Sequence, residues 1–233
     1  MNGGPDIASA AALFGDPVRA AMLTALLDRP VLSAGQLAFA ANVSPQAASF
    51  HLSKLTAGSL VIAARQGRRQ VYRLAGASVA NAIESLAAVS SASGVQQPHA
   101  HSERLRRLRA ARTCYDHLAG VAGVLLHDSL LSLEYLEPSD AKTYVLTGQG
   151  RKWFSDLGGP AELLRRRSPF ARPCLDWSEQ QPHLAGRLAA FLLDRFLAEG
   201  WIARLRDSRA VRITLRGQRE FERHYGLRVT TLP

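Results

Sequence analysis

Apolar residues in the first third of the chain recur at the spacing of an α-helix. Residues 17–28 carry one apolar stripe, which consists of Met22, Leu23, Leu26 and Leu27. Pro17 suits the start of this helix, because its missing N–H is not needed there. Residues 33–41 predict a second short helix, and Ser33 is placed to cap its free N–H groups. The pattern therefore begins with two short amphipathic helices.

The segment SPQAASFHLSKL predicts a third helix, because Ser44 is a capping residue and Pro45 suits the first helical position. One face of this helix is apolar and consists of Ala48, Leu52 and Leu55. The opposite face carries mostly short polar side chains and consists of Gln46, Ser49, Phe50 and Ser53. Such a face suits the major groove of DNA, where side chains must reach the edges of bases. His51 lies beside the apolar face, so a structural role is favoured for it over base contact.

Two strand-like runs around Gly67 follow the third helix, in the segment LVIAARQGRRQVYRL. This hairpin carries no acidic residue and four arginines, which are Arg65, Arg68, Arg69 and Arg73. Long cationic side chains reach phosphates without distinguishing bases, so Lys54 and the hairpin arginines are predicted to contact the DNA backbone. The predicted DNA-binding residues are Ser44, Gln46, Ser49, Phe50, Ser53, Lys54, Arg65, Arg68 and Arg69. Three helices followed by a basic hairpin have the order of a winged helix-turn-helix.

Composition supports a polyanionic partner. The 233 residues carry a formal net charge of +10, and 47% of them are hydrophobic. This charge favours nucleic acid or an acidic membrane surface. The chain has no apolar run of roughly 18 residues, as a membrane helix needs, and no signal-peptide pattern at its start. Two cysteines are too few for a disulfide framework, so a cytoplasmic protein that binds DNA and no membrane is expected.

Over residues 7–88 the sequence resembles the ArsR/SmtB family of small dimeric repressors. The similar segments are GDPVRAAMLTALLD, LSAGQLAFAANVSPQAASFHLSKL and QGRRQVYRL, with Gly58-Ser59 where the family usually has Ala-Gly. The resemblance implies a homodimer that residues 7–14 and about 78–88 hold together. A two-fold dimer in turn implies a roughly palindromic operator, with recognition helices about 34 Å apart.

The metal-binding residues of many relatives are missing at their usual two places. GQLAFAANV has no cysteine, and ASVANAIESLAAV has Glu84 but no histidine. Any signal is therefore expected to act elsewhere in the chain. Residues 89–101, which contain His99 and His101, are rich in Ser, Gly, Pro and Gln and predict a linker.

After the linker, the segment SERLRRLRAARTCYDHLAG predicts a helix over about 102–120. Five arginines stand close together in it, namely Arg104, Arg106, Arg107, Arg109 and Arg112. They form either a further surface for the DNA backbone or a face exposed to water.

The C-terminal half repeats itself. CYD, HLAGVAGVLLHDSLL and YVLTGQGRKWF in the first copy correspond to CLD, HLAGRLAAFLLDRFL and VRITLRGQREF in the second. So many matches in one order predict a duplication, with copies at about 102–160 and 161–233. Each copy predicts a helix, a two-stranded segment and a further helix, with Thr147 or Thr214 near an N-cap. The two copies are therefore interpreted as degenerate winged helices, paired with pseudo-symmetry.

If pseudo-two-fold packing brings the two copies together, Cys114, His117, Cys174 and His183 converge. Two thiolates and two imidazoles suit a thiophilic metal ion, zinc or a similar one. Three other interpretations stay open. The thiols sense oxidants, or Tyr115 and Trp177 line a pocket with the histidines for a small organic effector. Alternatively the cysteines are simply buried and the histidines cap helices.

The sequence thus predicts a mainly α protein with small β-hairpins (α+β). Residues 1–88 form a winged helix-turn-helix DNA-binding and dimerisation domain, 89–101 a linker, and 102–233 a duplicated effector domain. The predicted function is that of a dimeric repressor that an effector releases from DNA. A constitutive or architectural DNA-binding protein is the alternative. An enzyme with a Cys114 or Cys174 nucleophile is disfavoured, because no known nucleophile motif accompanies these residues.

Overall fold

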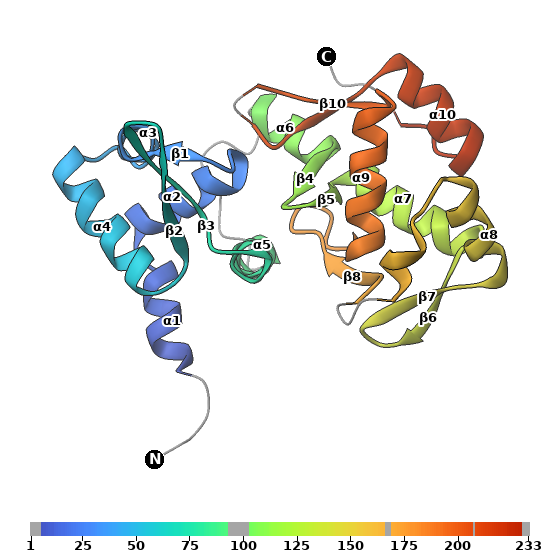
Figure 1. The fold of residues 1–233 in the computed structure, drawn as a ribbon, viewed down its shortest axis with the longest axis horizontal. Coiled ribbons are helices and arrows are strands. Elements are labelled where there is room, and N and C mark those ends of the chain that lie inside the picture. Colours follow the sequence, from blue (N-terminus) through green and yellow to red (C-terminus); the bar gives the residue numbers. More distant parts are fainter. Residues whose placement is uncertain (1–5, 93–102, 166–168, 207, 230–233) are drawn as a thin grey trace. The chain divides into compact units, whose positions relative to one another are not determined.

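A computed structural model of the chain describes residues 6–92, 103–165, 169–206 and 208–229. The chain forms two compact units, unit 1 with residues 1–83 and unit 2 with residues 84–233 (Figure 1). Helix α5 (Ala77–Ala92) crosses the division, so its first part belongs to unit 1 and its last part to unit 2. Both units combine helices with small antiparallel sheets, as the α+β prediction required.

Unit 1 has the element order of a winged helix-turn-helix. Its elements before α5 are α1 (Ile7–Phe14), α2 (Pro17–Asp28), β1 (Leu32–Ser33), α3 (Ala34–Ala40), α4 (Pro45–Ala57), β2 (Val61–Gln66) and β3 (Arg69–Leu74). The three strands form one antiparallel sheet in the order β1-β3-β2. Gly67 has a positive φ in the turn between β2 and β3, where a glycine fits without strain.

Side-chain caps start the three helices of the motif. The Asp16 side chain accepts from the Arg19 N–H at the start of α2, and Ser33 and Gln36 form a capping box on α3. Ser44 accepts from the Ala47 N–H at the start of α4. The predicted start of all three helices is thereby confirmed. The apolar stripes of these helices fill the core of unit 1. Its most buried members include Met22, Leu23, Leu26, Leu37, Leu52 and Leu55.

The predicted linker begins too early. Helix α5 continues to Ala92, because Ala, Val and Ser residues extend the helical pattern without a break. The first four residues of the predicted linker, 89–92, are therefore helical. The rest of it, with His99 and His101, lies outside the described residues.

Unit 2 contains the same order of elements twice, a hairpin, a helix, a second hairpin and a second helix. After α6 (Glu103–Ala110), the first set is β4 (Arg112–Cys114), β5 (His117–Ala119), α7 (Val121–Ser132), β6 (Leu136–Asp140), β7 (Thr143–Leu146) and α8 (Gly148–Asp156). The short 3-10 helix η1 (Ala161–Leu164) follows. The second set is β8 (Arg172–Leu175), β9 (Pro182–Ala185), α9 (Arg187–Ala198), β10 (Ile202–Arg204), β11 (Val211–Ile213) and α10 (Leu215–Tyr225).

The helix predicted over about 102–120 is wrong beyond Ala110. Residues 112–119 form the β4–β5 hairpin instead. Pairing with a distant segment stabilises the extended backbone, since the Thr113 N–H donates to the carbonyl of Arg209 at 2.8 Å. Tyr115 has a φ of 59° in the hairpin turn, which an α-helix does not allow. The equivalent hairpin β8–β9 was not predicted from the sequence either.

The predicted order of helix, hairpin and helix is present in α7, β6–β7 and α8, and again in α9, β10–β11 and α10. Thr147 and Thr214 are the N-caps of α8 and α10, as predicted, and each accepts from the N–H of a glycine three residues on. The winged-helix character of the two copies stays a prediction.

One hydrophobic core runs through unit 2 and joins residues from both sets of elements. Its most buried members include Leu130, Leu188, Leu192, Phe196 and Phe221. Among the described residues, no single helix has the length and apolar character to span a membrane. Helices α1 and α2 pass that test only as a pair, and they are bent by 79° at their junction.

Candidate nucleic-acid interface and candidate metal centre

Helix α4 has the buried and exposed faces that its sequence predicts. Ala48, Leu52 and Leu55 are each no more than 1% exposed and pack into the core of unit 1. The side chains on the other face, those of Gln46, Ser49, Phe50 and Ser53, are exposed. These four side chains are therefore accessible to a molecule that binds unit 1.

The serines of this helix already make local hydrogen bonds. Ser44 holds the N-terminus of α4, where its hydroxyl accepts from the Ala47 N–H at 3.2 Å. The hydroxyls of Ser49 and Ser53 donate to the carbonyls of Pro45 and Phe50. A hydroxyl that donates its proton still offers lone pairs to a base. Gln46 therefore remains the side chain on this face with both donor and acceptor groups to offer.

Phe50 and Lys54 form one exposed group at the middle of the helix. The Lys54 ammonium lies 4.5 Å from the centre of the Phe50 ring, and Phe50 is 56% exposed. His51 sits on the opposite edge, half-buried, with Nδ1 3.4 Å from a carboxylate oxygen of Asp16. Because Asp16 caps α2, this contact supports the structural role predicted for His51.

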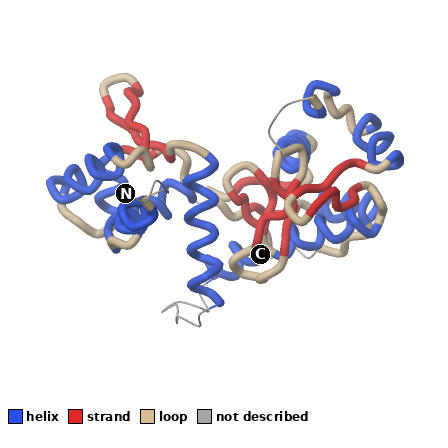
Figure 2. The backbone as a smooth tube through the Cα atoms, turned by 90° about the horizontal axis from the view of Figure 1, so that it is seen from below, coloured by secondary structure: helices blue, strands red, loops and turns tan. Residues whose placement is uncertain are grey.

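The hairpin β2–β3 carries the predicted arginines on an exposed surface. Arg65, Arg68 and Arg69 are all exposed, and Arg65 pairs with Gln70 across the two strands. The hairpin extends away from the helices of unit 1, as the two red strands and their tan turn at the upper left of Figure 2 show. Four arginines without an acidic neighbour in the hairpin make this wing strongly cationic.

In unit 2, four sulfur and nitrogen ligands come together. One potential ligand atom from each of Cys114, His117, Cys174 and His183 lies within 4.8 Å of all the others. Cys114 and both histidines are at most 1% exposed, and Cys174 is half-buried. The convergence of these four residues is therefore as predicted. We call them the Cys/His cluster.

Strand pairing explains how unequal spacings produce this cluster. Cys114 pairs directly with His117 across β4–β5, and Cys174 pairs directly with His183 across β8–β9. Directly paired residues point to the same face of a sheet, so each hairpin presents one thiol beside one imidazole. The longer second turn, between Asp176 and Gln181, absorbs the inserted residues through backbone hydrogen bonds without changing the register.

The two imidazoles face each other through Nε2, and the two Nε2 atoms are 3.1 Å apart. At the far side of each ring a carboxylate lies near Nδ1. That of Asp116 is 2.9 Å from His117 Nδ1, and that of Asp176 is 3.4 Å from His183 Nδ1. Neither histidine caps a helix, because Gly120 and Gly186 occupy the N-caps of α7 and α9.

The hydrogen bond between the two thiols shifts their pKa values in opposite directions. A hydrogen bond from Cys114, together with those from His117 and His183, lowers the pKa of Cys174 to about 2 despite its burial. The hydrogen bond to Cys174 and the burial of Cys114 raise the pKa of Cys114. Burial lowers the pKa of His183. Burial acts in the same direction on His117, but hydrogen bonds to Asp116 and Cys174 together outweigh it and raise the pKa of that ring. The cluster therefore holds a thiolate beside hydrogen-bonding rings.

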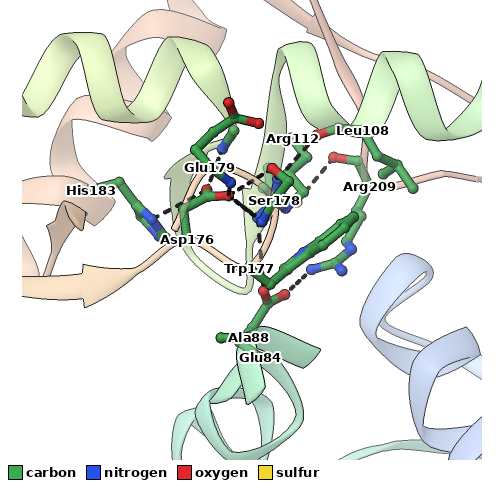
Figure 3. Close-up of polar contacts among 12 residues, drawn as sticks. Glu84, Ala88, Leu108, Arg112, Asp176, Trp177, Ser178, Glu179, His183 and Arg209 are labelled. Atoms are coloured by element: carbon green, nitrogen blue, oxygen red, sulfur yellow. Dashed lines mark hydrogen bonds and ion pairs between the residues drawn. The ribbon is translucent and has the colours of Figure 1, made fainter. Parts of the chain in front are cut away.

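Asp176 connects the cluster to a buried arginine. Figure 3 shows its carboxylate between the ring of His183 and the guanidinium of Arg112, to which the distance is 2.9 Å. The same carboxylate accepts from the backbone N–H of Gly120 at 2.7 Å. Burial opposes the ionisation of Asp176, but the charge of Arg112 and the hydrogen bonds from Arg112 and Gly120 lower its pKa to about 2. Glu84 in α5 lies 4.0 Å from Arg112 and is hydrogen-bonded to Arg209.

Three residues around the cluster differ from their sequence-based interpretation. Arg112 is fully buried and does not belong with the exposed arginines of α6, namely Arg104, Arg106, Arg107 and Arg109. Asp116 and Asp176 had no predicted role. The motif Cys-x-Asp, present in both copies, was the signal that could have identified these two carboxylates as neighbours of the histidines.

The two aromatic residues predicted to line an effector pocket lie in different surroundings. Tyr115 is 42% exposed in the β4–β5 turn. Trp177 is buried against the guanidinium of Arg112, which lies 4.5 Å from its ring centre. Unit 2 contains a cavity of about 410 Å³, and neither of these residues lines it. The walls of this cavity are mostly apolar and come from α6, α7 and β11, with Arg107, Arg212 and Arg228 among the lining residues.

The element order of unit 1, the capped α4 with its exposed polar face and the cationic hairpin define a winged helix-turn-helix protein. Residues 14–62 match the family model of a helix-turn-helix domain. The chain is 42% identical over 226 residues to the uncharacterized HTH-type transcriptional regulator YdfF of Bacillus subtilis. That match covers 97% of this chain and 99% of YdfF. The chain therefore belongs to the family of helix-turn-helix transcriptional regulators that includes YdfF, and it is a DNA-binding transcriptional regulator.

Among solved structures, the chain is 29% identical to the homodimeric winged helix-turn-helix domain of Mb0332 from Mycobacterium bovis, a possible ArsR-family regulator. The match covers 44% of this chain and 100% of that one, with a TM-score of 0.34. The cadmium metal-sensor CMTR from Mycobacterium tuberculosis is 37% identical over 34% of this chain and 81% of its own, with a TM-score of 0.31.

Proposed function

We propose that the protein is a homodimeric repressor that binds a roughly palindromic operator and releases it when unit 2 binds an effector. The observation that carries the proposal is the exposed polar face of α4 together with the cationic wing. Gln46 supplies base contacts, while Lys54 and the wing arginines contact phosphates. Residues 1–88 serve DNA binding and dimerisation in this proposal, and residues 102–233 serve effector binding.

Exposed apolar side chains on two helices support a homodimer. None of the residues of α1 is buried, although most of them are apolar, and Ile7 is 72% exposed. On α5, Leu86 and Val89 are exposed as well. Large apolar groups that a single chain leaves in water mark contact surfaces. These are also the two helices through which ArsR/SmtB repressors are expected to dimerise.

Two features of unit 2 that have no part in DNA binding support its role in binding an effector. Unit 2 brings together four sulfur and nitrogen ligands and contains a cavity of about 410 Å³. The near full-length match to a regulator favours this role over an enzyme that uses a cysteine nucleophile.

The proposal is tested by selecting binding sequences from random duplexes with the full-length protein. Analytical ultracentrifugation then gives the mass of the protein and of its complex. We expect an enriched site with two inverted halves, about one helical turn apart, that binds two chains. If the selected duplexes share no sequence and binding falls steeply with salt, the architectural alternative replaces the repressor. A complex with a single chain on a single half-site would exclude the homodimer.

A further inference from the structure

We propose that Cys114, His117, Cys174 and His183 bind one thiophilic cation of the zinc class. We further propose that this cation is the effector of the repressor, a step that rests on the function proposed above. The site differs in place from the two segments where many relatives carry their metal ligands, since it lies in unit 2 between hairpins β4–β5 and β8–β9. No residue of the DNA-binding motif takes part in it.

The distances fit a tetrahedral ion. With Zn–N bonds of about 2.0 Å, two nitrogen ligands of a tetrahedral zinc lie about 3.3 Å apart, and two sulfur ligands about 3.8 Å apart. The Nε2 atoms of His117 and His183 are 3.1 Å apart, and the four ligand atoms span no more than 4.8 Å. The side chains therefore need only small rotations to surround one ion.

The surroundings of the two histidines also suit metal ligation. The carboxylates of Asp116 and Asp176 lie beside the Nδ1 atoms, on the far side of each ring from the cluster. The two Nε2 atoms face each other across 3.1 Å in a buried place, where one cation can bind both of them. A carboxylate behind the ligating histidine is the usual arrangement at zinc sites.

The ligand set selects the class of metal. Thiolate and imidazole ligands suit zinc and related soft or borderline ions, whereas Mg²⁺ and Ca²⁺ prefer oxygen ligands. Cys174 is half-buried while the other three ligands are buried, so the ion reaches the site from the side of Cys174. A transient disulfide between the two cysteines is the competing use of the same residues, and the test includes it.

The neighbours of the cluster suggest how the ion acts on the protein. Asp176 touches both His183 and Arg112, and Arg112 lies 4.0 Å from Glu84 of α5. Closing His183 around an ion shifts the ring that lies against the Asp176–Arg112 pair. Glu84 lies in α5, and the turns of α5 that precede it belong to unit 1. Helix α5 therefore connects the surroundings of Arg112 to the DNA-binding unit along the chain.

The first experiment measures metal binding without DNA. Full-length protein is stripped with a chelator, kept reduced and titrated with Co²⁺, which reports thiolate ligation by a charge-transfer band and tetrahedral geometry by intense visible bands. We expect one Co²⁺ per chain, its displacement by Zn²⁺ and no displacement by Mg²⁺. Without a charge-transfer band in the wild-type protein, the proposed site does not exist. If oxidation forms a Cys114–Cys174 disulfide and the reduced protein binds no Co²⁺, the redox use replaces the metal site.

Variants assign the ligands. Cys174→Ser and His183→Asn should each lower Co²⁺ affinity at least 100-fold, while His224→Asn, a histidine of α10 outside the cluster, should bind as the wild type does. Circular dichroism establishes that each variant is folded. Should a ligand variant not fold, alkylation of the wild-type protein replaces it. Equimolar Zn²⁺ is expected to protect both cysteines, and unprotected cysteines would contradict the proposal.

The second experiment measures affinity for the selected operator with stripped and Zn²⁺-loaded protein. We expect loading to weaken binding on the order of 10-fold or more, within the usual range of allosteric coupling, and Cys174→Ser to abolish the difference. Equal operator affinity of a protein that binds zinc would refute the effector role alone. A protein that binds zinc but selects no operator would instead refute the function proposed above.

Discussion

Arg112 and Asp176 form an ion pair from which solvent is excluded. The guanidinium and the carboxylate are 2.9 Å apart, and neither side chain is exposed. The two residues stand 64 positions apart along the chain and belong to the hairpins β4–β5 and β8–β9. The pair therefore connects the two halves of unit 2 beside the Cys/His cluster.

Asp176→Asn should destabilise unit 2 strongly. The substitution keeps the size of the side chain but leaves the Arg112 charge buried beside a neutral amide, which typically costs about 3–5 kcal/mol. All three tryptophans, Trp153, Trp177 and Trp201, lie in unit 2. Urea unfolding followed by tryptophan fluorescence therefore reports on unit 2 specifically.

Asp116→Asn is the matched control, since it alters the aspartate of the first Cys-x-Asp motif. The Asp116 side chain is 52% exposed and lies against the ring of His117 rather than a buried cation, so the substitution should cost much less. Equal destabilisation of the two variants would show that the Arg112–Asp176 pair has no special weight.

Gly150→Ala should destabilise unit 2, because the backbone packs too closely at this position. A Cβ at Gly150 would lie 1.9 Å from the carbonyl oxygen of Tyr135, a distance that requires the backbone to move. We expect the free energy of unfolding, measured in the same fluorescence assay, to fall by about 1–3 kcal/mol. Gly148→Ala, at the first position of the same helix, meets nothing within 4 Å and should change stability by about 0.5 kcal/mol or less. A neutral Gly150→Ala would mean that α8 and the Tyr135 carbonyl are further apart than the structure shows.

Replacing Arg68 and Arg69 together with alanine should weaken binding to operator and random DNA to a similar degree. Phosphates carry little sequence information, so the slope of log affinity against log salt should fall by about one for each phosphate that is no longer neutralised. Fluorescence anisotropy at several salt concentrations measures both effects. Arg151→Ala, an exposed arginine of unit 2, serves as the charge control. Weaker binding to the operator alone would instead place the wing arginines at base edges.

Gln46→Ala should relax sequence preference more than it lowers total affinity. A side-chain amide that binds a base edge contributes on the order of 1–3 kcal/mol of discrimination. Competition between the operator and single-base variants measures this preference. Gln70→Ala, an exposed glutamine of the wing, is the control. Unchanged discrimination would remove Gln46 from the base-contacting surface.

Much of unit 1 could be predicted because its signals are local. The apolar stripe of α2, the capping residues Ser33 and Ser44, and the Gly67 turn act between residues a few positions apart. Such signals specify each helix and the hairpin before any long-range contact forms. The boundary errors, at the ends of α5 and α6, fall where helical propensity alone does not show where a helix stops.

The sequence by itself determined the DNA-binding motif, its polar and apolar faces, and the identity of the four cluster residues. Only the tertiary structure decided that Cys114 and His117 belong to a hairpin, that the spacings of three and nine residues produce equivalent pairs, and that Arg112 is buried. The physical reason is the distance along the chain over which each interaction acts. Strand pairing and a buried ion pair draw their free energy from partners far apart in the chain, and no local pattern of side chains encodes which partner each residue meets.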